Sequence, residues 1–111
     1  MKKSLEVPVF NEMMCELFQA MKELGGSGTI REIDDKTIEI LGLPAEVQEI
    51  MHGNSSKTEV EYRLAWTRTY MKKVGILENS SRRVWSLTAK GREMEQIDPK
   101  EVVQKVREMT L

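Results

Sequence analysis

The residues best suited to chemistry in this sequence are cationic, and they gather in one part of the chain. Residues 57–92 contain 9 Lys or Arg and 3 Asp or Glu, a balance of +6, although the formal net charge of the whole chain is only −1. Because an anionic partner responds to the local field more than to the net charge, this segregation indicates a basic surface that binds phosphates. The alternative is a solvated surface with no partner.

Residues that could serve catalysis or metal binding are scarce. His52, the single histidine, precedes Gly53 at the predicted end of a helix, so an interaction with the helix dipole is a simpler role for it than catalysis. Cys15 is the single cysteine, and no basic cluster near it would lower its pKa, so we interpret it as an inert or interface thiol. We therefore predict no catalytic site, no metal site and no cofactor.

The composition fits one compact soluble domain. A chain of 111 residues with 40% apolar content has the size of a single core and leaves no room for a second, catalytic domain. No window approaches the roughly 18 consecutive apolar residues that span a bilayer, and the N-terminus lacks the apolar run of a signal peptide. One cysteine cannot form an intramolecular disulfide, which agrees with a reducing compartment. We expect a cytoplasmic protein with no membrane contact.

Three helices are predicted in the first half of the chain. Apolar residues at helical spacing over residues 10–24 predict the first. Thr29 is the expected N-cap of the second, because Glu32 completes a capping box, and Gly42 is expected to end it. Pro44 opens a short third helix. The predicted buried stripe of the second helix comprises Ile30, Ile33, Thr37, Ile40 and Leu41.

The longest helical pattern covers residues 57–74, where Ser56 and Glu59 have capping-box spacing. The face predicted to be buried comprises Val60, Leu64, Thr67, Met71 and Val74. The opposite face, predicted to meet solvent or a ligand, comprises Glu61, Tyr62, Ala65, Arg68, Thr69 and Lys72. Trp66 and Trp85 could stack on bases, but aromatic side chains in a small domain are more often part of the core.

Beyond residue 75 the apolar residues no longer follow the spacing of a helix. Short β-prone runs at 76–78 and 84–87 flank a cationic turn that contains Arg82 and Arg83, which predicts a hairpin. Thr88 is expected to cap a helix over residues 89–96, and Asp98 a last helix with a narrow apolar stripe. That stripe comprises Val102, Val103, Val106 and Met109.

This order of elements predicts a mainly α fold with a small β-hairpin, a winged helix-turn-helix with a C-terminal helical extension. We expect residues 1–96 to form the DNA-binding domain and residues 97–111 a C-terminal helix for dimerisation or linkage. In a winged helix the long helix enters the major groove of duplex DNA and the hairpin tip reaches the backbone. The predicted DNA contacts are Ser55, Ser56, Lys57, Thr58, Tyr62, Arg63, Arg68, Thr69, Lys72, Arg82 and Arg83.

Residues 62–94 resemble the N-terminal domain of Mrr-type restriction proteins. The likeness comprises Arg63, Trp66, the run 69–78 (TYMKKVGILE) and the run 85–93 (WSLTAKGRE), and it extends more loosely upstream to about residue 8. The family often has Asn where this chain has Tyr62. The resemblance implies a DNA-binding winged helix that delivers a separate nuclease domain or subunit to modified DNA.

A nuclease of that kind holds Mg²⁺ with an acid on one strand and a Glu-x-Lys on the next. No Glu-x-Lys occurs in the chain, and the Asp34-Asp35-Lys36 run lies within a predicted helix, where we interpret it as a solvated face. We therefore predict DNA binding without nuclease activity. The alternatives are a free-standing transcriptional regulator and a winged helix used for protein contacts.

Self-association is a further hypothesis from the sequence. The apolar stripe of the last helix is too narrow to fold alone, and Phe18 and Cys15 lie outside the predicted core face of the first helix. Both features predict a second buried surface, which a homodimer on a palindromic DNA site would supply. The alternative is that residues 97–111 fold back on their own domain or lead toward a partner.

Overall fold

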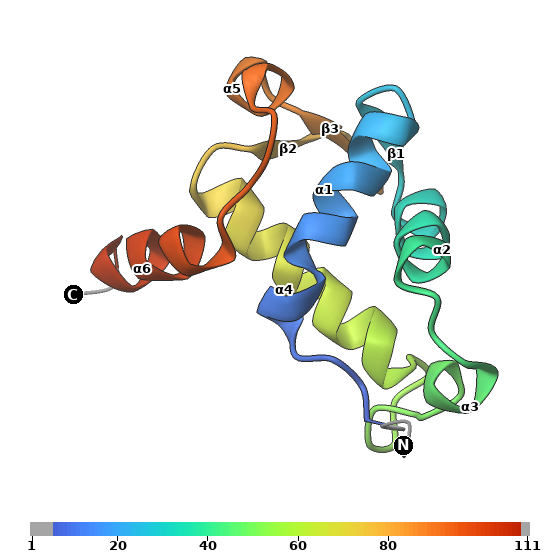
Figure 1. Ribbon diagram of the computed structural model, residues 1–111. Coiled ribbons are helices and arrows are strands. Elements are labelled where there is room, and N and C mark those ends of the chain that lie inside the picture. The colour runs from blue at the N-terminus through green and yellow to red at the C-terminus, as the bar shows by residue number, and fades with distance from the viewer. Residues whose placement is uncertain (1–5, 110–111) are drawn as a thin grey trace.

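The computed structural model describes residues 6–109 and shows a mainly helical fold with a small three-stranded antiparallel sheet (Figure 1). Helix α4 runs through the middle of the fold, and the other elements pack around it (Figure 1). The elements are a 3₁₀ helix η1 (Phe10–Met13), α1 (Met14–Glu23), β1 (Ser27–Thr29), α2 (Ile30–Leu41), α3 (Ala45–Gln48), α4 (Glu59–Lys73), β2 (Leu77–Ser81), β3 (Val84–Leu87), α5 (Ala89–Glu93) and α6 (Pro99–Met109).

The predicted start and end of α2 are confirmed. The Thr29 hydroxyl accepts a hydrogen bond from the Glu32 amide at 3.1 Å, and the Glu32 carboxylate accepts one from the Thr29 amide at 2.8 Å. Gly42 ends the helix in the left-handed conformation, at φ 64°. These interactions pair backbone groups that a helix terminus otherwise leaves unpaired.

The start of α4 differs from the prediction. The capping box is formed by Thr58 and Glu61 rather than by Ser56 and Glu59, and α4 begins at Glu59. Both pairs have the same spacing, so sequence alone did not separate them. Ser55, before the cap, lies in a turn in which its hydroxyl donates to the His52 carbonyl at 2.7 Å.

The predicted buried face of α4 is confirmed, because all five of its residues lie in the interior. The methionine-rich face of α1 packs in the same core. Phe18 was predicted outside that core and is in fact buried. The buried residues of α1 and α4 are Met14, Leu17, Phe18, Ala20, Met21, Val60, Leu64, Thr67, Arg68 and Met71, with Val74 at the C-cap of α4.

The sheet contains the predicted hairpin and one strand that was not predicted. The strand order is β1-β3-β2, and both pairings are antiparallel. Strand β1 lies between the first two predicted helices, with Gly28 opposite Trp85. A Ser-Gly-Thr run has little β propensity, so this strand depends on the free edge of β3 and not on its own composition.

Helix α6 folds back on its own domain, packing against α4 and η1. Ile97, Val102 and Val106 are buried in the common core, whereas Met109 at the end of the stripe is 57% exposed. The Cys15 thiol lies 3.7 Å from the Ile97 carbonyl oxygen. Of the residues that suggested a homodimer, Phe18, Val102 and Val106 are buried within the chain, whereas Cys15 and Met109 are exposed. Helix α5 ends at Glu93, three residues earlier than predicted.

No helix within residues 6–109 combines the length and the apolar character needed to cross a bilayer.

The core assignment predicts opposite effects for two substitutions in α4. Leu64→Ala should lower the free energy of unfolding by about 2–5 kcal/mol, because it leaves a cavity in the core. Thr69→Ala, on the outer side of α4, should change it by less than about 0.5 kcal/mol. Chemical denaturation measures both, and the reverse order of effects would show that the helical phase is wrong.

The position of α6 predicts that a chain ending at Gln96 is markedly less stable. It lacks three buried side chains, each of which contributes about 1.5 kcal/mol or more. Met109→Ala is the control, since that side chain is exposed, and it should unfold like the intact chain. Sedimentation equilibrium should show a monomer for the intact chain, and equal stability of the truncated chain would contradict the packing of α6.

Candidate nucleic-acid interface

The outer side of α4 carries an aromatic and small-residue surface. Tyr62, Ala65, Trp66 and Thr69, together with Lys57 before the helix, line an open hollow of about 350 Å³. Trp66 is 45% exposed, so the prediction that it belongs to the core was wrong. Its ring packs edge-on against Tyr70, which in turn packs on Phe10, with ring centroids 6.5 and 4.5 Å apart.

Arg68 was predicted on the outer face of α4 and is buried instead. Its side chain is 5% exposed and forms an ion pair with Asp34 of α2, whose side chain is 7% exposed. The Asp34 position was interpreted as a solvated helix face, and that interpretation was wrong as well. Arg68 lies at the flank of the buried face, and α2 covers this flank. Arg68 is therefore not free to contact DNA.

The guanidinium of Arg68 also faces the hairpin. It lies 5.7 Å from the ring centroid of Trp85 on β3, and the Lys72 ammonium lies 5.8 Å from the same centroid. Lys72 donates a hydrogen bond to the Asn79 side chain on β2 at 3.0 Å. Cations of α4 therefore hold the hairpin against the helix.

Burial dominates the titration of Asp34. Desolvation raises the pKa of this carboxyl from 3.8 to about 6, although the Arg68 guanidinium acts in the opposite direction. The charged groups around it are Arg68 and Glu61 of α4, Arg31 and Asp35 of α2, and Arg83 of the hairpin tip. The ion pair is thus a buried interaction with a substantial desolvation cost.

A second network fixes the first turns of α4. Arg63 donates from Nε to Glu59 at 2.7 Å and from a terminal nitrogen to the Val7 and Pro8 carbonyls at 2.7 and 3.2 Å. Half-buried Arg63 therefore anchors the N-terminal segment to α4. A role for it in contacting DNA would require these bonds to break.

His52 belongs to the same network. Its Nδ1 lies 2.8 Å from a Glu59 carboxylate oxygen, and its ring stacks on Tyr62 with centroids 3.6 Å apart. This hydrogen bond, with the contribution of Arg63, lowers the pKa of Glu59. The predicted helix-dipole role was wrong, because α3 ends at Gln48, four residues before His52.

The hairpin tip presents two exposed arginines. Arg82 and Arg83 occupy the turn between β2 and β3, and Arg83 has a positive φ of 62°. The Arg83 carbonyl accepts a hydrogen bond from the Ile30 amide at 3.1 Å, which ties the tip to the start of α2.

The predicted contact residues before α4 divide into two groups. Ser55, Ser56 and Lys57 are exposed, whereas Thr58 is half-buried and occupied as the N-cap of the helix. Lys73, which was not predicted as a contact, is exposed on the outer side of α4. Its position four residues after Thr69 places it one turn further along the same side, and that spacing could have identified it.

No group of three or more His, Cys, Asp or Glu within residues 6–109 could hold a metal ion. Partial burial, with Glu16 and Asp98 nearby, raises the pKa of the exposed Cys15 thiol, which keeps it protonated.

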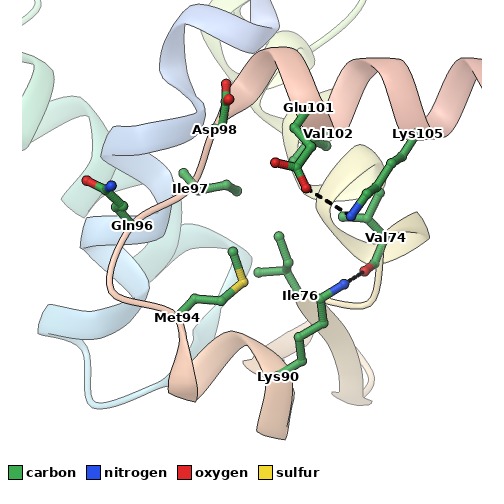
Figure 2. Close-up of a pocket in the computed structure, with 10 residues that line it drawn as sticks. All are labelled: Val74, Ile76, Lys90, Met94, Gln96, Ile97, Asp98, Glu101, Val102 and Lys105. Carbon is green, nitrogen blue, oxygen red and sulfur yellow. Dashed lines mark hydrogen bonds and ion pairs between the residues drawn. The ribbon is translucent and has the colours of Figure 1, made fainter.

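A separate hollow of about 270 Å³ lies between the end of α4, α5 and α6 (Figure 2). Its lysines are already paired, because Lys90 donates to the Val74 carbonyl at 2.9 Å and Lys105 lies 3.0 Å from Glu101. None of the predicted contact residues lines it.

A comparison with protein-family models decides the affiliation of the chain. The model of the Mrr N-terminal domain matches residues 10–96. The chain belongs to the Mrr N-terminal domain family. The match runs from η1 past the end of α5 and includes every exposed cation of α4 and of the hairpin. No curated protein and no solved structure matches the chain. Helix α6 of this Mrr N-terminal domain protein lies outside the matched range.

Asp34 predicts a specific dependence of stability on pH. Its pKa in the folded protein lies above its ordinary value, so the folded state holds a proton that the unfolded chain lacks between about pH 4 and 6. The stability of the wild type relative to Asp34→Asn should therefore fall as the pH rises through this window, by up to about 3 kcal/mol. Denaturant titrations at several pH values measure this difference.

Asp35→Asn is the matched control, because it removes the neighbouring exposed carboxylate of the same helix. Its stability relative to the wild type should change little over the same window. A flat difference for Asp34→Asn would contradict the raised pKa.

Proposed function

We propose that this protein binds double-stranded DNA as a winged helix. The order α1, β1, α2, α4, β2, β3 and the strand order β1-β3-β2 are compatible with that fold, in which α4 is the recognition helix and the β2–β3 hairpin the wing. Membership of the Mrr N-terminal domain family supports the role of DNA-recognition module in an Mrr-type restriction system. Cleavage would then come from a nuclease on a separate domain or subunit.

The proposal rests on which lysines and arginines form ion pairs with carboxylates of the protein. Among the described residues, Lys57, Lys73, Arg82 and Arg83 form no ion pair with a carboxylate, whereas Arg63 and Arg68 do. Exposed and unpaired cations can neutralise phosphates and release condensed counterions, which supplies affinity for duplex DNA.

The structure changes the proposed contact set accordingly. We assign DNA contacts to residues that are exposed or half-buried on the outer side of α4, before this helix and at the hairpin tip. We assign positioning roles to Thr58, Arg63 and Arg68, whose polar groups hold α4 to the rest of the protein. The proposed contacts are Ser55, Ser56, Lys57, Tyr62, Trp66, Thr69, Lys72, Lys73, Arg82 and Arg83.

The double substitution Arg82→Ala and Arg83→Ala tests the role of the wing. Binding of a duplex should weaken, and the slope of log affinity against log salt should flatten by about 1–2, if each arginine contacts one phosphate. Fluorescence anisotropy over a series of salt concentrations measures both effects.

A matched control removes the same number of charges elsewhere. Lys100→Ala with Lys105→Ala alters α6, which lies on the side of α4 away from α2 and the hairpin tip (Figure 1). This variant should retain the wild-type slope. If both double variants change the slope equally, binding depends on net charge and not on the wing.

A further inference from the structure

The outer face of α4 is short of groups that read bases by hydrogen bonds. Arginine reads guanine with two parallel hydrogen bonds, and Asn or Gln reads adenine in the same way. Residues 59–73 contain no Asn or Gln. Both arginines of α4 are engaged within the protein, Arg63 by Glu59 and two carbonyls and Arg68 by Asp34.

Two further polar groups of α4 are engaged within the protein. The Thr69 hydroxyl donates to the Ala65 carbonyl at 3.0 Å, which leaves its methyl group as the part available to a ligand. One oxygen of the Glu61 carboxylate, Oε1, accepts from the amide and the hydroxyl of Thr58 at 2.9 and 3.0 Å.

The hollow at the middle of α4 is therefore lined mainly by apolar groups. Ala65, the Thr69 methyl, the indole of Trp66 and the ring of Tyr62 surround the hollow of about 350 Å³. Lys57 lies at its rim, and Lys73 is exposed one turn beyond Thr69. This arrangement of an apolar centre with unpaired cations at its ends fits the edge of a base flanked by backbone phosphates.

We propose that this hollow receives the methyl group of thymine in the major groove. Of the four standard bases only thymine presents an apolar group there, at C5, and small or aromatic side chains are its usual contacts. The inference rests on the proposed function, because it requires α4 to enter the groove. It adds that α4 selects thymine by an apolar contact and that its flanking lysines contribute affinity without selecting a sequence.

The test compares a short alternating A·T duplex with the same duplex in which uracil replaces thymine. The two differ by the C5 methyl group alone. The wild type should bind the uracil duplex more weakly, by about fourfold for each thymine methyl group that the protein covers in the A·T duplex. Fluorescence anisotropy at one salt concentration measures both affinities.

Three variants locate the effect. Trp66→Ala should lose the preference for thymine, and Thr69→Ser, which removes one methyl group and keeps the hydroxyl, should reduce it even if the tryptophan variant folds poorly. Lys73→Ala should weaken binding to both duplexes by the same factor and keep their ratio.

The outcomes separate the two proposals. Equal affinity of the wild type for the two duplexes would overturn the thymine contact and leave the DNA-binding function intact. A preference that Trp66→Ala and Thr69→Ser both retain would overturn the assignment to this hollow. Failure to bind either duplex at low salt would overturn both proposals.

Discussion

The buried ion pair between Asp34 and Arg68 is the constraint on which the arrangement of this domain depends. The two residues are 34 positions apart in sequence, and their pairing sets α2 against α4. The same guanidinium faces Trp85 of β3, so one side chain relates the two helices to the hairpin. The attraction between two buried charges offsets the cost of their desolvation only when their geometry is good. If α2 or α4 were rotated about its axis, one of the two charges would be buried without its partner. We infer that the pair favours this packing of α2 and α4 over alternatives more than it adds stability.

This constraint divides the cations of the basic segment between two tasks. The arginines of α4 face carboxylates and carbonyls of the protein, where the planar guanidinium can make several directed hydrogen bonds. Lys73 and the arginines of the hairpin tip are exposed, and Lys72 is exposed although it donates to Asn79. Charge segregation along the chain indicated a basic surface, but fewer of its cations face outward than their number in the sequence suggests.

Helical periodicity was sufficient to predict the interior of α4 but not its flanks. Leu64 and Met71 lie at the centre of the apolar stripe, where any packing arrangement buries them. Arg68 lies at the margin, and its burial depends on which neighbouring helix covers that side, a long-range property that local spacing does not contain. Trp66 is the converse case, an aromatic residue at the opposite margin that no element covers fully. Strand β1 was missed for a related reason, since β3 supplies its hydrogen-bonding partner.

The attachment of the hairpin tip to α2 has a kinetic and entropic consequence. Arg83 holds a left-handed conformation that costs a non-glycine residue about 1 kcal/mol, and the hydrogen bond from Ile30 helps to maintain it. The hairpin tip is thereby held against the start of α2. For the proposed binding of duplex DNA, little conformational freedom of the hairpin tip then remains to be lost on association. The proposed encounter with DNA would then depend on electrostatic steering and would not wait for the hairpin to order.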